Sequence, residues 1–470
     1  MSKLLCIFTL LCVFAGAVFA KTYSFDEALE RLYKIDDSVQ AAEKNVEQSK
    51  AQKKAAFGMR LPSVGITAKY TFLDSPIYMD LNPVRDAIQP LYDASGSGVT
   101  LPSFKEQVQQ DKFFKAEAVA SVALFTGGKI CSANMSAEAA VDESKARFEG
   151  LKNNMLYDLS VKYYGAIVAE MAVEARKEYM ESARAHAADS AKMLSAGTIA
   201  KVEKMSADLS CSEAETDYNL SLNDAELAAD LLKNTLYEDS PVNLSSELFV
   251  CCAKDIESLE YFKKLAKAQN SALKVYDARI KTAASKIKMQ NSAFMPSIFL
   301  FGSRELYDRD LTPSDPEYAY GAQLEWNLFS GLSDTNKRKS AILEKESANF
   351  LRKKEEKDID NQIEYFYKKM LNAVYKYKTM QENIALSKEF LKARTLAFET
   401  GTGTSLEVNT ARAQLLKSQL ESISASYDFV TSLAGMLSLC GNTGDFNLYR
   451  DKAVSREKIS RLDGLKEQLK

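Results

Sequence analysis

Few residues of this chain could do acid–base, metal or redox chemistry. The 470-residue sequence contains one histidine, His186, which excludes multi-histidine metal sites and most histidine-based catalysis. It shows no nucleophile motif, phosphate-binding loop or metal-ligand cluster, and adjacent carboxylates such as Glu355 and Glu356 lie in charge-rich helical segments. We therefore expect no enzyme, no cofactor and no metal site.

Five cysteines lie beyond the first 20 residues, at positions 131, 211, 251, 252 and 440. An odd number leaves at least one thiol unpaired within a monomer, and the spacing matches no zinc site. A bridge between the adjacent Cys251 and Cys252 would be strained. We expect these two to be reduced, buried thiols.

Glu203 and Glu407 are the carboxylates whose placement indicates a function. Each lies six residues after a glycine, Gly197 or Gly401. In a symmetric assembly an inward-facing set of either residue would form a ring of carboxylates that favours cations. The alternative is that each Glu, in the first turn of a helix, interacts with the positive end of the helix dipole and faces water.

Both carboxylates belong to a unit that occurs twice in the chain. The repeated segments are 56–63 with 292–297, 124–127 with 328–331, and 196–198 with 400–402. Each unit predicts a helix, a proline corner, two short strands, a glycine corner, a long helix, a glycine turn and a last helix. We place the first repeat at residues 21–248, with its helix turn near 197, and the second at 249–448, with its turn near 401.

Four segments have the alternating apolar and polar pattern of β-strands, at about 63–73, 117–126, 297–307 and 318–329. Each has about 10 residues, the length that a tilted strand needs to cross a membrane. Residues 74–116, which include Pro76, Pro83, Pro90 and Pro102, are predicted to form a long irregular surface loop, with 308–317 as its shorter counterpart. The alternative for the strands is a small soluble sheet with one buried face.

The segments from Gly127 to Gly197 and from Gly331 to Gly401 predict two very long helices, because no proline interrupts them. At 1.5 Å per residue each helix would be about 100 Å long and would need a coiled-coil-like partner. The last helix carries such a seam, with apolar residues in 4,3 spacing at Leu416, Leu420, Ile423, Tyr427, Val430, Ala434 and Leu437.

The two ends of the chain differ from the repeats. Residues 1–20 have the pattern of a signal peptide, without the cysteine at the cleavage point that an N-terminal lipid anchor needs. Beyond them we expect no transmembrane helix. The remainder has 60 basic and 64 acidic groups, a balance that argues against nucleic-acid binding. The charged tail at 449–470 carries no recognisable motif.

Four strands cannot close a transmembrane barrel, since the smallest have about 8, so the chain must pool its strands with copies of itself. In the order, duplication and spacing of these motifs, the chain resembles the TolC family of outer-membrane efflux and secretion channels. The motifs that carry the resemblance are the strand–helix corners at Pro62, Gly127, Gly128, Pro296 and Gly331 and the turns at Gly197 and Gly401.

The resemblance implies a mainly α-helical fold with a small β part, assembled as a homotrimer. A 12-strand β-barrel would lie in the outer membrane of a Gram-negative-type cell, and an α-helical barrel would continue it through the periplasm. The function implied is a passive exit duct of a tripartite efflux pump or a type I secretion system.

The partners implied are outer-membrane lipid, a periplasmic membrane-fusion adaptor and an inner-membrane transporter. The adaptor would contact the two turns, at Ala196, Gly197, Thr198, Thr400, Gly401 and Thr402. The periplasmic entrance would be lined by Glu203, Glu407 and Thr410, the last at a position where some members carry a further Asp.

Two other classes of protein share some of these features. A secreted or surface coiled-coil adhesin would have the long helices, but it would not need membrane-length strands or duplicated corners. A periplasmic adaptor has one helical hairpin flanked by compact β domains, whereas this chain has a strand-pair and long-helix unit twice.

Overall fold

The computed structural model describes residues 21–307 and 316–453. The predicted signal peptide, most of the 308–317 connection and most of the C-terminal tail lie outside this part of the chain. The described residues form two compact units. The first contains the residues up to 45, residues 144–275 and those from 352 onward, and the second contains 46–143 and 276–351.

The two compact units do not coincide with the two sequence repeats, which we expect to meet near residue 248. Each compact unit contains parts of both repeats. The reason is that each repeat needs the other: strand β5 of the first pairs with strand β7 of the second, and helix α5 of the first packs against helix α9 of the second.

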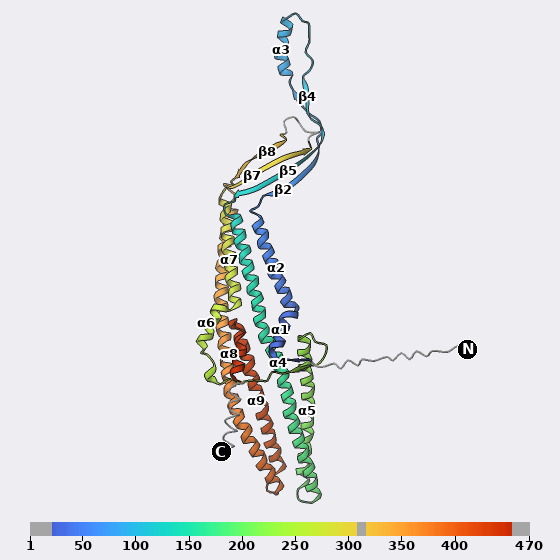
Figure 1. Ribbon diagram of the computed structural model, residues 1–470, viewed down its shortest axis with the longest axis vertical. Coiled ribbons are helices and arrows are strands. Elements are labelled where there is room, and N and C mark those ends of the chain that lie inside the picture. Colours follow the sequence, from blue (N-terminus) through green and yellow to red (C-terminus); the bar gives the residue numbers. More distant parts are fainter. Residues whose placement is uncertain (1–20, 308–315, 454–470) are drawn as a thin grey trace, which may run out of the picture. The chain divides into compact units, whose positions relative to one another are not determined.

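The chain alternates helices and strands (Figure 1). The helices are α1 (Phe25–Ile35), α2 (Asp37–Gly58), α3 (Asn82–Ala94), α4 (Lys129–Ser195), α5 (Lys201–Thr235), α6 (Leu259–Gln269), α7 (Ser271–Asn291), α8 (Ser333–Glu399) and α9 (Ser405–Cys440). The strands are β1 (Lys21–Tyr23), β2 (Ser63–Phe72), β3 (Ile77–Asp80), β4 (Lys105–Gln109), β5 (Lys112–Phe125), β6 (Val242–Leu244), β7 (Ser297–Tyr307) and β8 (Tyr318–Glu325).

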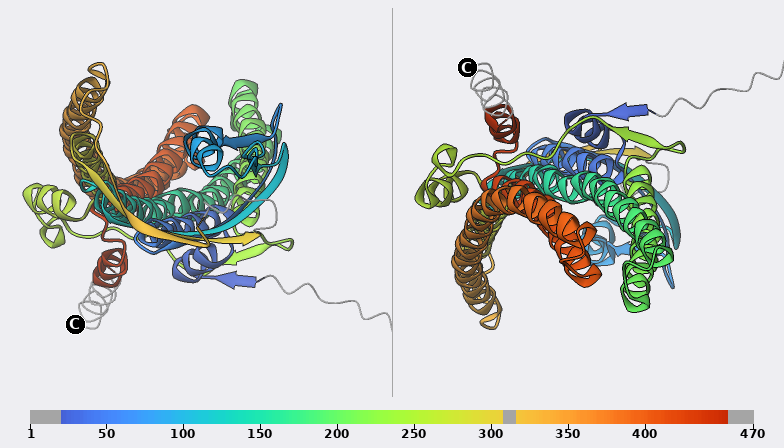
Figure 2. Two further views of the ribbon diagram at one scale, coloured as in Figure 1. Left: turned by 90° about the horizontal axis from the view of Figure 1, so that it is seen from above. Right: turned by 90° about the horizontal axis from the view of Figure 1, so that it is seen from below.

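The two long helices are confirmed. Helices α4 and α8 have 67 residues each, and α5 and α9, which follow the glycine turns, have 35 and 36. A helix of that size is about 100 Å long. Viewed end-on, the green pair α4 and α5 and the orange pair α8 and α9 are two hairpins (Figure 2).

The second unit contains one antiparallel sheet of four strands in the order β2-β5-β7-β8. Its strands lie close to the predicted segments, with two differences. Strand β5 begins at Lys112, five residues earlier than expected, because it pairs with β2 as far as Phe72. Strand β8 ends at Glu325, four residues earlier than expected, where its pairing with β7 stops at Ser297.

The segment between β2 and β5 is more regular than predicted. Instead of an irregular loop over 74–116, it holds a two-stranded ribbon of β3 and β4 that brackets helix α3. Pro83 lies in the first turn of α3, where the missing N–H costs nothing, although Pro90 lies inside the helix. The Asn82 side chain accepts a hydrogen bond of 2.9 Å from the Phe104 amide and so links the two sides of the segment.

The core of the first unit is aromatic and centred on Phe25 of α1. Its ring contacts Tyr163, Tyr164 and Phe446, with ring centroids 5.0 to 5.5 Å apart. The Tyr163 hydroxyl donates a hydrogen bond of 2.8 Å to the Tyr23 carbonyl. This core joins the N-terminal strand to α4 and to the residues after α9.

The predicted seam of α9 is right in its C-terminal half only. Val430, Ala434 and Leu437 are buried, whereas Leu416, Leu420 and Ile423 are half-buried. In the N-terminal half the buried positions are shifted and smaller, at Val408, Ala411, Leu415, Ser418, Ser422 and Ala425. Helix α9 is long and apolar enough to cross a membrane, but 72% of its apolar 18-residue stretch is buried inside the structure.

None of the five described cysteines forms a disulfide. Cys251 is buried and lies 3.1 Å from the Tyr449 carbonyl oxygen. Cys252 is exposed, so the expectation of two buried thiols is wrong for it. The chain is extended there, and adjacent side chains point to opposite sides.

Candidate functional site: the helical turns

The two turns that join the paired helices have the same backbone conformation. Gly197 and Gly401 have φ values of +71° and +74°, in the left-handed region that glycine tolerates. The Thr198 amide donates to the Met193 carbonyl at 2.9 Å, and the Thr402 amide donates to Ala397 at the same distance. These are Schellman caps, which satisfy the last carbonyls of α4 and α8.

The six turn residues predicted to contact an adaptor are exposed: Ala196, Gly197, Thr198, Thr400, Gly401 and Thr402. Apolar side chains lie exposed in the first turns of the following helices. Val202 and Met205 of α5 have 65% and 58% of their surface exposed, and Leu406 of α9 has 67%. The hairpin ends therefore offer polar tips with apolar flanks, as surfaces covered by a partner do.

Glu407 stabilises the start of α9. It forms a capping box with Thr404, in which each residue's side chain accepts a hydrogen bond from the other's backbone amide. Its carboxylate also lies 3.3 Å from the Arg394 guanidinium of α8. Thr410, one turn further on, is exposed and donates to the Leu406 carbonyl. The structure thus gives Glu407 the helix-start role that the sequence left open as an alternative.

Glu203 of α5 caps the start of α9 in the other hairpin rather than the start of its own helix. Its carboxylate accepts a hydrogen bond of 2.7 Å from the backbone amide of Ser405, the first residue of α9. The N-cap of its own helix is Ala200, which provides no side-chain cap. The two glutamates, equivalent in sequence, therefore both act at the start of α9.

His186 of α4 was not predicted to belong to this site. Its Nε2 lies 2.8 Å from the Ser405 hydroxyl, and its ring contacts Phe398 edge-on with centroids 4.7 Å apart. Only 6% of its surface is exposed. Burial, and then the positive charge of Arg412, lower the pKa of His186 to about 4, so the imidazole is neutral at physiological pH. No sequence pattern around His186 marks this contact.

Arg412 of α9 is buried beside it. Its guanidinium donates to the Ser182 hydroxyl of α4 at 2.8 Å and to the Asn409 side chain at 3.2 Å. Burial lowers its pKa. We call His186, Glu203, Ser405 and Arg412 the hairpin junction, because they join α4 and α5 to α9 by hydrogen bonds.

The strand–helix corners lie in the second unit. Pro62 and Pro296 immediately precede β2 and β7. Gly127 has φ of +59°, and a Cβ there would lie 2.8 Å from the Met295 Cβ. Gly128 and Gly331 have positive φ as well. At Gly127 a side chain would clash, whereas Gly128 and Gly331 have open space and only their left-handed backbone favours glycine. The glycines turn the chain from strand to helix, and the prolines lie where it passes from helix to strand.

The turn residues cap helix ends and offer an exposed surface for a partner, and they carry no group arranged for catalysis. Over residues 21–307 and 316–453, no group of three His, Cys, Asp or Glu side chains could hold a metal ion. The polar groups of the hairpin junction already have hydrogen-bond partners: His186 and Glu203 bond to Ser405, and Arg412 bonds to Ser182 and Asn409.

The comparison with known proteins connects these features to a family. Residues 263–442, which run from α6 to just past α9, match the family model described as outer membrane efflux protein. This part of the chain is therefore similar to outer membrane efflux proteins. The match fits the expected outer-membrane channel rather than an adhesin or an adaptor, and it indicates an outer-membrane location.

Solved structures of outer-membrane channels show the same fold over nearly the whole chain. The outer membrane channel CmeC of Campylobacter jejuni is 17% identical with a TM-score of 0.70, and the match covers 89% of this chain and 86% of that one. VceC of Vibrio cholerae is 14% identical with a TM-score of 0.69, covering 89% and 96%. MtrE of Neisseria gonorrhoeae is 15% identical with a TM-score of 0.61, covering 89% of each. No curated protein sequence matches the chain.

Proposed function

We propose that three copies of this efflux protein assemble into one channel and form the exit duct of a tripartite efflux pump or type I secretion system. The observation that carries the proposal is the four-stranded sheet. Among the described strands, β2 and β8 each pair on one side only, so each leaves an edge with unsatisfied backbone groups. Pairing β8 of one copy with β2 of the next would close a barrel of 12 strands.

The assembly is tested by fractionation and conductance. We expect heat-resistant trimers in the outer-membrane fraction that conduct ions in planar bilayers. A soluble periplasmic monomer without conductance would overturn the proposal.

The two turns are the proposed contact with the adaptor. They are exposed, and their backbones are rigidly capped, so they can present a fixed surface to a helical partner. Thr198→Trp should abolish export while trimers still assemble, with Ser97→Trp, in the exposed segment after α3, as the matched control. Normal export with Thr198→Trp would reject the contact.

We propose that Glu407, with Glu203 and Thr410, narrows the periplasmic entrance. Glu407 is half-buried and pairs with Arg394 through one carboxylate oxygen, so it would contribute a weaker charge than a free carboxylate. Glu407→Ala should relieve block by trivalent cations from the periplasmic side and raise conductance. The control is Glu30→Ala, which removes an exposed carboxylate on α1, distant in sequence from Glu407. An unaltered block would remove Glu407 from the entrance.

We also propose that α3 and the β3–β4 ribbon lie outside the cell. An epitope tag at Gly96, in the exposed turn after α3, should bind antibody on intact cells. Labelling that requires a broken outer membrane would reverse this orientation.

A further inference from the structure

The two faces of the four-stranded sheet differ in polarity. Paired residues share a face, and the register aligns Ile66 with Ala118, Ala118 with Arg304, and Arg304 with Tyr318. The face that carries these residues is mostly apolar and includes Val64, Ile66, Tyr70, Leu300, Tyr320 and Leu324. The opposite face carries Ser63, Thr67, Lys69, Glu117, Gln323 and Glu325. We call the first the apolar face.

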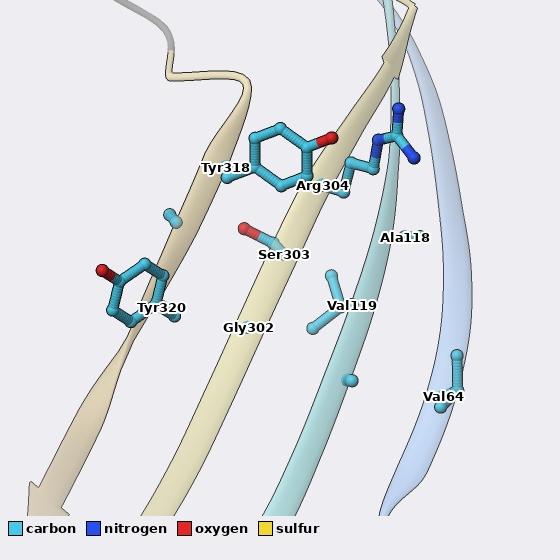
Figure 3. Close-up of a pocket in the computed structure, with 10 residues that line it drawn as sticks. Val64, Ala118, Val119, Gly302, Ser303, Arg304, Tyr318 and Tyr320 are labelled. Carbon is cyan, nitrogen blue, oxygen red and sulfur yellow. The ribbon is translucent and has the colours of Figure 1, made fainter.

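A hollow of about 330 Å³ lies on this sheet (Figure 3). Its lining on the inner strands, which we call the floor, includes Ala118, Ala120 and Gly302, whose small size leaves space between larger neighbours. Val64 of β2 borders it on one side, and Tyr318 and Tyr320 of β8 border it on the other. The floor belongs to the inner strands β5 and β7, so pairing of the edge strands with another copy would not cover it.

Arg304 brings a positive charge to this apolar hollow. Its guanidinium carbon lies 5.1 Å from the centre of the Tyr318 ring, which holds the side chain over the aromatic face. The Glu317 carboxylate is 3.9 Å away, and both side chains are more than half exposed, so this ion pair is weak and leaves guanidinium donors available. A guanidinium can bind phosphate through two parallel hydrogen bonds.

The position of Arg304 along the strands indicates which part of a lipid it would meet. It lies near the end of β7 that is remote from Pro296, and Tyr318 begins β8 at the same end. The helices follow from the opposite ends of the strands, at the proline and glycine corners. Lys112, the first residue of β5, pairs with Phe72 and adds a second cation to the apolar face at this end. In the proposed orientation this is the level of the outer-leaflet headgroups, which Arg and Lys reach by snorkelling.

We propose that the hollow binds a phosphorylated lipid of the outer leaflet, with an acyl chain on the Ala118, Ala120 and Gly302 floor and the phosphate on Arg304. The inference rests on the proposed function for its orientation in the membrane. It adds a specific lipid site, built from an apolar groove and a cation at its outer end, to a surface that would otherwise contact lipid without selectivity.

The test uses delipidated trimers in detergent and native mass spectrometry. The probes are phosphatidic acid, diacylglycerol with the same acyl chains, and inorganic phosphate. We expect wild-type trimers to retain phosphatidic acid roughly tenfold better than Arg304→Gln trimers, because the variant loses the charge-assisted hydrogen bonds to the phosphate. Arg304→Lys should retain part of the binding. Gly302→Leu, which fills the floor where a Cβ has ordinary contact distances, should lose it.

Controls separate this site from general lipid contact and from the channel itself. Lys69→Gln, on the opposite face, should bind as the wild type does. Equal retention by wild-type and Arg304→Gln trimers would overturn the proposal, as would full competition by inorganic phosphate, which would indicate an ion site. Conductance of the same variants should be unchanged. Wild-type protein that forms no trimer would defeat the proposed function instead, so the two failures are distinguishable.

Discussion

The turn at Gly197 and the turn at Gly401 end their long helices with the same hydrogen bonds, yet the helices that follow begin differently. Helix α9 starts with a full capping box of Thr404 and Glu407. Helix α5 starts at Ala200 without a side-chain cap. The glutamate that could have helped α5 binds the first amide of α9 instead.

This difference shows how a duplicated unit can keep its backbone while its side chains take unequal roles. Two backbone amides at the start of α9 donate hydrogen bonds to side chains, that of Glu407 to Thr404 and that of Ser405 to Glu203. The Ser405 hydroxyl also contacts His186. The start of α5 receives no side-chain cap of its own. We infer that the second turn is the fixed partner and that the first hairpin is held in place by hydrogen bonds to it.

The largest expected effect is the pH dependence of the hairpin junction. Above about pH 6.5 His186 is neutral in both the folded and the unfolded chain. Between pH 6.5 and pH 4 only the unfolded chain takes up the proton, so the free energy of unfolding falls, by roughly 3 kcal/mol at 1.36 kcal/mol per pK unit. Below the folded pKa of about 4 both states are protonated, so the free energy of unfolding falls no further on account of His186.

This prediction can be measured on a single signal, because His186 is the one histidine of the chain. Isotope-labelled histidine in protein without a histidine tag should titrate near pH 4. His186→Gln should remove the corresponding loss of thermal stability between pH 6.5 and 4. A titration near the ordinary value of 6.5 would show that the junction is open in solution.

The second largest effect tests whether the two turns have the same backbone conformation. Gly197→Ala and Gly401→Ala should each lower the free energy of unfolding by about 1–2 kcal/mol, because both residues adopt the left-handed conformation. A Cβ at either position meets nothing within 4 Å, so no steric clash contributes. Thermal unfolding in detergent should therefore give equal shifts. Clearly unequal shifts would mean that the turns differ in solution.

Capping substitutions should act in opposite directions at the two turns. Thr404→Ala removes the cap of α9 and should destabilise by about 1 kcal/mol, whereas Ala200→Ser supplies the missing cap of α5 and should stabilise by roughly 0.5–1 kcal/mol. Hydrogen exchange of the first-turn amides reports each helix separately. Destabilisation by Ala200→Ser would show that α5 tolerates no cap there.

The smallest effect is expected from the ion pair of the second turn. Arg394 and Glu407 are both more than a third exposed, so Arg394→Gln should cost less than about 1 kcal/mol and should cost less still at high salt. Arg184→Gln, which breaks a more exposed pair with Glu215 in the first hairpin, is the comparison. A loss well above 1 kcal/mol for Arg394→Gln alone would show that the second turn depends on its charge pair.

Local sequence patterns were sufficient to predict most of the helices and strands of this protein. The absence of proline predicts α4 and α8, and left-handed glycines predict their ends. Alternation of polar and apolar residues predicts the four strands of the sheet, because each strand has two faces in different surroundings. The order of these elements was enough to indicate the family.

Only the tertiary structure determined the contacts between residues that are distant in sequence. The acceptor role of Glu203 involves an amide 202 residues away, and His186 meets a hydroxyl 219 residues away. The N-terminal half of α9 buries Ser418 and Ser422 rather than the larger Leu416 and Leu420, because close helix packing there favours small side chains. Sequence periodicity records which residues are apolar, whereas packing between segments determines which of them are buried and which polar groups find partners.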